Sequence, residues 1–463
     1  MGTRIERDSM GEMQVPESAY YGAQTQRAVE NFPVSGLTIP ACMVEALGMI
    51  KLAAAKVNHR LGLLDKERTQ AIIQASEEVV AGKFNDQFPI DVFQTGSGTS
   101  SNMNVNEVIG NRASELMGGQ IGSREPVHPN DHVNKGQSSN DVIPTSIYVA
   151  TAIALEKRLK PALTALHQAL AEKSQAFDHI VKIGRTHLQD ATPIRLGQEF
   201  SGYATMIENA IDRVGQAQQA VSRLAIGGTA VGTGINTHVE FGSSVAQELS
   251  DLTGMRFDEA PNHFEAQAMA CSAVEVSGAL KTVAVGMSKI ANDIRWLGSG
   301  PRAGLGELIL PAVQPGSSIM PGKVNPVICE AVIQASAQVI GNDTAITHGG
   351  LGGVLELNLM LPLIAHNVLE SIGILAGAAT MFKDKLIVGL EVDEARCADY
   401  IEKSLAMCTS LAPVIGYDAA AAIAKEAHAS GRTVREVARE KQIVSDEELH
   451  RLLDPLSMTK PKG

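Results

Sequence analysis

The sequence predicts a mostly α-helical protein, and three observations carry this prediction. Aromatic residues make up only 4% of the 463 residues, while Ala, Leu, Val, Met and Gln are plentiful, which favours helix-on-helix cores over packed sheets. Apolar residues recur at alternating steps of four and three from Met269 to Leu297, the heptad pattern of a long helix packed nearly parallel to others. This pattern stops at GSGP, residues 298–301, which is typical of a helix end.

The other expected elements follow in chain order. Residues 1–137 mix helical runs with Gly-, Asn- and Ser-rich loops and are expected to form an N-terminal domain. A second long helix is expected over 141–178, where Leu residues line one side and Pro161 predicts a kink. Three further segments show helical patterns: 196–225, 326–346 and 357–382.

Helices of this length exceed what one compact domain uses. We therefore expect a central domain, 138–392, whose long helices form a bundle completed by other subunits. After residue 390 the expected helices become short, and Thr433 with Glu436 and Ser445 with Glu448 predict capping boxes. Residues 393–463 are thus expected to form a small C-terminal helical domain, which agrees with about three domains for this length.

Composition excludes several classes of partner. A formal net charge of −12 argues against nonspecific binding to nucleic acid or to anionic lipid, because both require a cationic face. The five cysteines are odd in number and lack a CxxC pair, so neither a disulfide framework nor a zinc site is indicated. The N-terminus fits no targeting signal and no apolar run approaches about 18 residues, so no membrane span and a cytoplasmic location are expected.

Four polar segments interrupt the helical pattern, and the first two are suited to binding an anion. In 95–104 (TGSGTSSNMN) glycines let backbone N–H groups approach a ligand, and a following helix would direct its N-terminus there; a plain Gly/Ser loop is the commoner meaning of such a stretch. In 128–145, Ser138, Ser139 and Asn140 stand at the start of the long helix. Capping requires only one of these three residues.

The other two polar segments carry candidate acid/base groups. In 184–193 (GRTHLQDATP), Thr186 precedes His187, whose imidazole titrates near neutrality, although a lone His is more often structural. The segment 313–326 (VQPGSSIMPGKVNP) is not a Walker A loop, because five residues separate its glycines and Val follows Lys323. The remaining candidates are therefore acid/base groups and neutral donors around an anion.

A metal site is not expected. His128 and His132 lie four residues apart with Asp131 between them, which is a spacing that metal sites use. Pro129, however, argues against a continuous helix there, and the HExxH pattern is absent. No dinucleotide fingerprint or GxSxG nucleophile turn occurs either.

Residues 316–326 (GSSIMPGKVNP) resemble a loop of the fumarase/aspartase superfamily, and the match to class II fumarases is close. The resemblance covers nearly the whole chain and includes GSGTSSNMNVNE, HPNDHVNKGQSSND, GRTHLQDA and IGYDAAAAIAKEA. It implies reversible, cofactor-free hydration of fumarate to (S)-malate, a reaction of the tricarboxylic acid cycle. It also implies a three-domain chain in a homotetramer with a central long-helix bundle, in which three subunits build each active site.

The resemblance further implies roles for individual residues. Ser317 would remove the C3 proton of malate, and Lys323 with Asn325 would stabilise the aci-carboxylate that forms. His187, partnered by Glu330, would protonate the departing hydroxyl or activate water in reverse. Further residues would hold the substrate: Ser97, Gly98, Thr99, Ser138, Ser139, Asn140, Thr186, Ser318 and Val324.

Members of this family also have a second anion site. The corresponding residues here are His128, Pro129, Asn130 and Asp131. The preceding Glu125 stands where a basic residue is usual, which counts against strong anion binding at this place.

Two alternatives to a fumarase remain open. An aspartate ammonia-lyase uses the same scaffold, but Gly322, the Ser138 and Ser139 pair and the GSGT stretch each match fumarases better. A structural homologue that has lost catalysis is the other alternative. Such a protein would be expected to have lost residues at the acid/base positions, but Ser317, Lys323, Asn325, His187 and Glu330 are all present.

Overall fold

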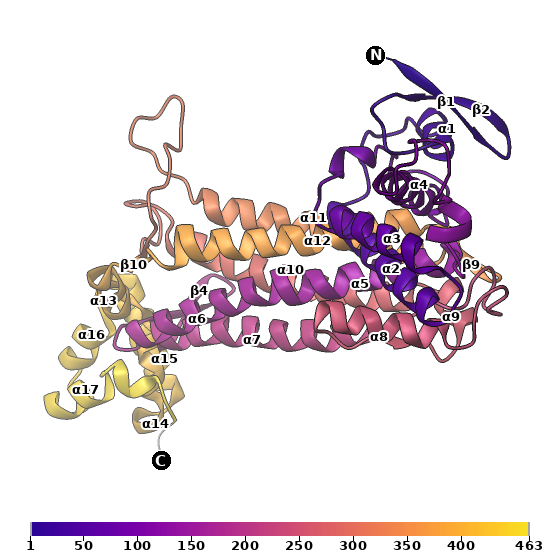
Figure 1. Cartoon of the computed structure of the whole chain (residues 1–463). Coiled ribbons are helices and arrows are strands. Elements are labelled where there is room, and N and C mark those ends of the chain that lie inside the picture. The colour runs from indigo at the N-terminus through magenta and orange to yellow at the C-terminus, as the bar shows by residue number, and fades with distance from the viewer. Residues whose placement is uncertain (1, 462–463) are drawn as a thin grey trace. The chain divides into compact units, whose positions relative to one another are not determined.

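The computed structural model describes residues 2–461 and confirms a mostly helical fold (Figure 1). The chain divides into two compact units, and each is discontinuous in sequence. Unit 1 comprises Met1–Pro161, Asp212–Ala284 and Ala337–Ala376. Unit 2 comprises Ala162–Ile211, Val285–Ser336 and Gly377–Gly463. The expected domains 1–137, 138–392 and 393–463 are a different subdivision and stay a prediction.

Unit 1 is organised around helix α2 (Ala41–Arg60), which packs against α3 (Lys66–Val80), α5 (Ser139–Ala154) and α8 (Phe241–Thr253). Most of this helix is buried on all sides, including Met43, Leu47 and Ile50, as expected of a helix at the centre of a bundle. The shorter helices of unit 1 are α1 (Ala23–Asn31), α3 (Lys66–Val80), α4 (Thr99–Leu116), α5 (Ser139–Ala154), α8 (Phe241–Thr253) and α9 (His263–Ala268).

Small strand pairs complete unit 1. Strands β1 (Thr3–Asp8) and β2 (Gly11–Pro16) form an antiparallel hairpin, with Thr3 opposite Pro16. Two further pairs are only two residues long. They are β5 (Arg223–Leu224) with β6 (Asp258–Glu259), and β8 (Gly353–Val354) with β9 (Leu357–Asn358).

The long helices confirm the helical segments expected from the periodic patterns. They are α6 (Lys160–Ala176), α7 (Leu196–Ala220), α10 (Cys271–Leu297), α11 (Val327–Gly350) and α12 (Leu361–Phe382). The heptad positions of α10 from Ala273 to Leu297 are all at most 5% exposed. Met269 is a correction: it caps the end of α9, before α10 begins, and is 40% exposed.

The long helix expected over 141–178 is interrupted. Helix α5 passes through a π-helical turn, η3 (Leu155–Leu159), before α6 begins. The Lys160 N–H donates to the Leu155 carbonyl, which closes the wider turn. Pro161 accounts for the irregularity, because it has no N–H to donate and its ring crowds the preceding turn.

One helical stretch corrects the expectation that no apolar run is long enough for a membrane. Leu361–Ile387, which joins α12 to the π-helical turn η4 (Lys383–Ile387), is long and apolar enough to cross one by length and composition. Of its most apolar window, 67% is buried inside the protein. Burial of this extent is typical of a core helix.

Unit 2 contains a hairpin that the sequence analysis did not predict. Strands β3 (Val181–Thr186) and β4 (Gln189–Arg195) pair antiparallel, with Val181 opposite Arg195 and Thr186 opposite Gln189. A short pair, β7 (Leu308–Ile309) with β10 (Glu391–Val392), lies in the same unit.

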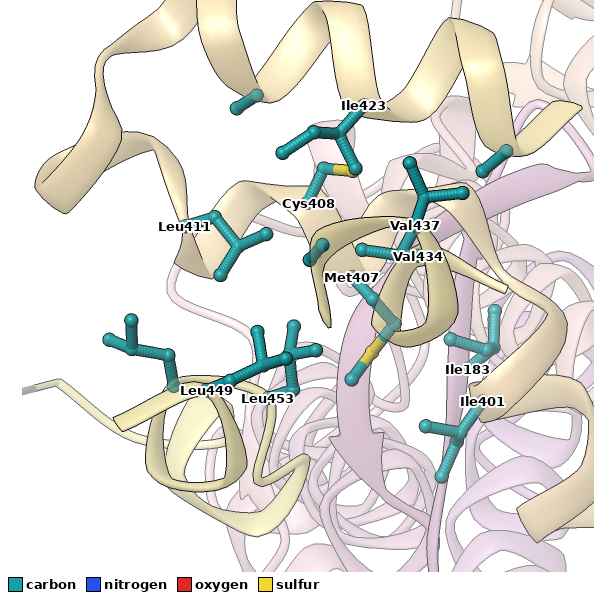
Figure 2. Close-up of a cluster of buried hydrophobic side chains, with 14 residues drawn as sticks. Ile183, Ile401, Met407, Cys408, Leu411, Ile423, Val434, Val437, Leu449 and Leu453 are labelled. Atoms are coloured by element: carbon teal, nitrogen blue, oxygen red, sulfur yellow. The ribbon is translucent and has the colours of Figure 1, made fainter. Parts of the chain in front are cut away.

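The C-terminal helices of unit 2 share one apolar core with this hairpin. They are α13 (Glu394–Lys403), α14 (Ala412–Ile415), α15 (Tyr417–Ser430), α16 (Val434–Glu440) and α17 (Asp446–Leu452). Figure 2 shows Ile183 from β3 beside Ile401, and Ile183 is fully buried in the cluster. Thr433 and Glu436 form the expected capping box. Ser445 accepts the Glu448 N–H as expected, but Glu448 pairs with Arg451 at 3.6 Å instead of completing the box.

Candidate active site

Three hydroxyl groups in unit 1 connect the N-terminal ends of α4 and α5. The Ser97 Oγ lies 2.8 Å from the Thr99 Oγ1, which lies 2.8 Å from the Ser139 Oγ. Gly98 precedes α4 with a φ of 73°, and a Cβ there would lie 2.9 Å from the Ile143 side chain. Glycine therefore allows the tight entry into α4 that brings these hydroxyls together.

The start of α5 is capped by Ser138. Its hydroxyl accepts the Asn140 N–H, while the Asp141 carboxylate accepts the Ser138 N–H at 2.9 Å. Asn140 donates its side-chain amide to the Ala230 carbonyl at 2.8 Å. Capping thus uses one of the three residues, Ser138, and the Ser139 hydroxyl faces Thr99. Two helix N-termini meet here, which favours a negatively charged ligand.

Asp141 is completely buried beneath these residues. Burial raises its pKa to about 6, although N–H groups of Ser138, Thr229 and Gly227 and the charge of Lys51 act in the opposite direction. Its second oxygen accepts from Gly227 at 3.1 Å and from Thr229 at 2.9 Å. This carboxylate holds the start of α5 to the loop that follows β5.

In unit 2, His187 lies at the tip of the β3–β4 hairpin. His187 and Leu188 form its two-residue turn with φ values of 57° and 61°. Both central residues are left-handed, as in a type I′ turn, and for non-glycine residues this costs about 1–3 kcal/mol each. Thr186 and His187 are exposed, and Leu188 is 62% exposed. Other contacts must therefore maintain this strained turn.

A buried ion-pair network provides such contacts. Arg185 donates two hydrogen bonds to the Glu307 carboxylate, both at 2.9 Å, and Glu307 is 0% exposed. The Lys182 ammonium lies 3.4 Å from Glu307 and 3.3 Å from Glu199. The hairpin is thus anchored by charge as well as by the core around Ile183. Sequence analysis assigned no role to Arg185 or Glu307, and Glu307 lies in a loop with no local pattern to mark it.

The loop of residues 313–326 leaves the helices before α11 (Figure 1) and is closed at its base. The Gly316 N–H donates to the Lys323 carbonyl at 2.8 Å, and the Asn325 side chain donates to the Gly316 carbonyl at 2.7 Å. A Cβ on Gly316 would lie 2.7 Å from both the Asn325 nitrogen and the Lys323 oxygen. Only glycine allows this close approach of the two strands of the loop.

Within this loop, the Ser317 hydroxyl oxygen accepts two backbone hydrogen bonds. The donors are the N–H groups of Ile319 at 3.2 Å and Met320 at 2.9 Å. Both donors favour negative charge on that oxygen. The sequence alone does not specify which backbone groups of the loop contact Ser317.

The other predicted residues near the loop are mostly exposed. Lys323, Ser318 and Val324 face outward, and Asn325 is half-buried. Glu330 is exposed in the first turn of α11, and within residues 2–461 of this single chain it forms no ion pair with His187. The expected partnership of these two residues stays a prediction.

The residues of the expected second anion site form a π-helical turn, η2 (Pro129–Val133). The His128 Nδ1 accepts the N–H groups of Asn130 and Asp131, both at 3.2 Å, so this ring atom caps the turn. The His128 N–H in turn donates to the His132 Nδ1 at 2.8 Å. In the described residues, no group of three or more His, Cys, Asp or Glu side chains gathers closely enough to hold a metal ion.

Comparisons with known proteins identify the family. Residues 11–341 match the lyase family, and residues 407–460 match the fumarase C C-terminus family. The chain is 57% identical to the class II fumarate hydratase of Halobacterium salinarum, covering 98% of this chain and 97% of that protein. It is 51% identical to the mitochondrial fumarate hydratase of Mus musculus, covering 99% and 91%.

A solved structure agrees with these sequence relatives. The recombinant class II fumarase from Schistosoma mansoni superposes with a TM-score of 0.97 at 39% identity, over 100% of both chains. Fold and sequence therefore agree over nearly the whole length, and the chain belongs to the class II fumarate hydratase family of lyases.

Proposed function

We propose that this hydro-lyase interconverts fumarate and (S)-malate without a cofactor, using the residues of the hairpin, the loop and the hydroxyl cluster described above. The observation that carries this proposal is the Ser317 hydroxyl, which accepts the N–H groups of Ile319 and Met320 inside a loop closed at Gly316. Removal of the C3 proton of malate requires a base held in place before the reaction. A serine hydroxyl becomes such a base only where its alkoxide is stabilised.

Ser317 is the proposed base in the dehydration direction. Hydrogen bonds to an ionised oxygen are roughly twice as strong as neutral ones, so two backbone donors stabilise the alkoxide more than the hydroxyl. The Lys323 ammonium, in the same loop, is proposed to stabilise the alkoxide further by its positive charge. After proton transfer, the alkoxide becomes a neutral hydroxyl that keeps both backbone contacts.

The carbanion that forms is an aci-carboxylate with an additional negative charge. Lys323 and Asn325 are proposed to stabilise this charge, and donors fixed in advance are the most effective ones. The hydroxyls of Ser97, Thr99 and Ser139, with the N-termini of α4 and α5, are proposed to hold the substrate carboxylates. Gly98, Ser138, Asn140, Thr186, Ser318 and Val324 complete the proposed binding set.

His187 is the proposed acid at the other carbon. It protonates the departing hydroxyl at C2, and in the hydration direction it accepts a proton from water. Glu330 is proposed to orient the ring and to favour its charged form. The position of His187 at the tip of an anchored hairpin supports this role, because the ring can reach a ligand that lies beyond the hairpin.

The active form is proposed to be a homotetramer in the cytoplasm, with each site shared between subunits. Apolar side chains next to the candidate catalytic groups support this assembly, because they are open to solvent in a single chain. Leu188, beside His187, is 62% exposed, and Ile319, beside Ser317, is 83% exposed. Contact with other copies would cover them and exclude water from the reaction. Size-exclusion chromatography with light scattering would measure the mass directly.

A single assay distinguishes the hydration of fumarate from ammonia elimination. The relatives reported above are named fumarate hydratases, which favours malate over aspartate as substrate. Purified protein is incubated with each compound while the ultraviolet absorbance of fumarate is followed. We expect fumarate to form from malate; formation only from aspartate would overturn the proposal, and inactivity on both would favour a catalytically silent homologue.

Ser317→Ala tests the proposed base. Loss of a positioned acid/base group lowers rates by about 10²–10⁴-fold, so we expect turnover near the detection limit while the oligomer persists. Ser430→Ala is the matched control, because Ser430 is exposed and belongs to no candidate ligand set. Its hydroxyl donates to carbonyls of its own helix and accepts from the Arg432 side chain at 3.1 Å. A Ser317→Ala variant with near-normal kcat would exclude Ser317 as the base.

A further inference from the structure

Lys51 lies in the middle of α2 and is 0% exposed. Lysine is almost never fully buried unless its ammonium is paired. Its Nζ donates to the Asn102 Oδ1 at 2.8 Å, the Gln137 Oε1 at 2.9 Å and the Asn134 Oδ1 at 3.0 Å. An ammonium has three N–H groups and no acceptor, so these three amide oxygens use its entire donor capacity.

The three oxygens come from the two segments that carry the candidate substrate ligands of unit 1. Asn102 is in the first turn of α4, which begins at Thr99, and Gln137 directly precedes the α5 cap, Ser138. Asn134 belongs to the second segment, and its Oδ1 also accepts from the Asn102 side chain at 3.3 Å. The two segments are therefore joined around a single buried cation.

Asp141 fixes the start of α5 through a second set of hydrogen bonds. Its carboxylate accepts the Ser138 N–H at 2.9 Å and the Thr229 N–H at 2.9 Å. The backbone of Ser138 is thus fixed by Asp141, while the side chain of the preceding Gln137 is fixed by Lys51. The opposite charges of Lys51 and Asp141 favour each other in this buried region.

We infer that Lys51 is a positioning residue for substrate binding, one that sets the separation between the start of α4 and the start of α5. This inference rests on the proposed function, because the aligned groups are the hydroxyls of Ser97, Thr99 and Ser139, whose 2.8 Å contacts span the same two segments. Lys51 bonds to none of these hydroxyls and acts through Asn102, Asn134 and Gln137. A shift of less than 1 Å between the segments breaks such contacts.

The test is a pair of variants, Lys51→Met and Gln137→Leu. The first removes all three N–H donors with little change in length. The second removes the Gln137 acceptor, together with the bonds that its amide donates to the Val133 and Lys135 carbonyls at 3.1 and 3.3 Å, while Lys51 keeps two acceptors. The KM and kcat for fumarate are measured together with the inhibition constant of succinate, which has no double bond to hydrate. We expect KM and the succinate constant to rise about tenfold while kcat stays within about threefold, because carboxylate ligands serve ground and transition states alike.

Lys173→Met is the matched control for loss of a lysine. Lys173 is half-buried in unit 2, where it donates to the Leu390 carbonyl at 2.8 Å, and it belongs to no candidate ligand set. This variant should keep the wild-type KM and succinate constant. Gln137→Glu, which keeps oxygens for Lys51 to bind, should resemble the wild type more closely than Gln137→Leu does. Circular dichroism and the oligomer mass verify that each variant folds.

The outcomes separate this inference from the proposed function. Folded Gln137→Leu with unchanged KM and succinate constant overturns the inference, as does a fall in kcat alone. If Lys51→Met fails to fold, Gln137→Leu decides the question by itself. Inactivity of the wild-type protein on fumarate and malate overturns the proposed function, and that result is known before any variant is measured.

Discussion

Replacing Glu307 by Gln should weaken the anchor of the His187 hairpin. The Glu307 side chain is 0% exposed, accepts two hydrogen bonds from Arg185 at 2.9 Å and lies 3.4 Å from the Lys182 ammonium. Glutamine preserves the shape and one acceptor oxygen, but its NH₂ group faces a donor of Arg185. The loss includes one charge-assisted hydrogen bond, about 1.5–3 kcal/mol, and the negative charge opposite two buried cations.

The expected loss of stability depends on the contacts that Lys182 and Arg185 keep in the Glu307→Gln variant. Removing one partner of a buried ion pair costs about 3–5 kcal/mol, because the other charge is left uncompensated. Lys182 keeps Glu199 at 3.3 Å, and Arg185 keeps one hydrogen bond to the amide oxygen. We therefore expect the free energy of unfolding to fall by about 3 kcal/mol, at the lower end of that range. Because Arg185 is two residues from His187, kcat should fall as well.

Urea unfolding at fixed protein concentration measures this loss, with the fluorescence of the single tryptophan, Trp296, as the signal. Hydration kinetics measured in parallel report on His187. Asp399→Asn is the matched control, since it makes the same chemical change in an exposed pair with Lys403 and should leave both measurements at wild-type values. A Glu307→Gln variant with wild-type stability and kcat would show that the buried pair does not anchor the hairpin.

Three further predictions follow from the packing and the charges. Ile183→Ala removes a fully buried side chain from the core shared by β3 and the C-terminal helices, and the free energy of unfolding in urea should fall by about 2–5 kcal/mol. Ile309→Ala, at a 48% exposed position, should cost much less. Equal losses in the two variants would contradict the assignment of the core. Gly316→Ala places a Cβ 2.7 Å from two backbone atoms and should therefore open the base of the loop. We expect kcat to fall while the midpoint of urea unfolding changes little. An unchanged kcat would show that catalysis does not require the closed base of the loop. Burial lowers the pKa of Lys51 to about 7 from its ordinary 10.5, so the three-donor ammonium described above is the form present below that pH. Between pH 7 and about 10 the unfolded chain binds more protons than the folded chain, so stability should rise with pH. Lys51→Met should lack this rise, and parallel curves of stability against pH for the two proteins would refute the prediction.

The long helices could be predicted because their signal is local and repeated. From Ala273 to Leu297, each apolar step of three or four residues returns to the same helix face, and all these positions are buried. The β3–β4 hairpin had no such signal. Its turn is His187–Leu188, and neither residue is the Asn, Asp or Gly that usually marks a left-handed two-residue turn.

The sequence indicated a chemistry for the candidate site, which stays a prediction, and it left most of the geometry of the site open. The polar segments between helices indicated an anion site with acid/base groups, and they include Ser317 and His187. The two backbone donors to Ser317 depend on the path of the loop, which the glycines permit but do not specify. The proposed pairing of His187 with Glu330 stays a prediction within a single chain.

The sequence by itself determined the helical class, the heptad seam of α10 and the residue types available for chemistry, because periodic burial and motif identity are properties of neighbouring positions. Only the tertiary structure decided which polar groups meet. Arg185 and Glu307 are 122 residues apart, and Lys51 bonds to residues 51, 83 and 86 positions away. Hydrogen bonds and ion pairs depend on distances and angles at the scale of an ångström, and these are set when distant segments pack together.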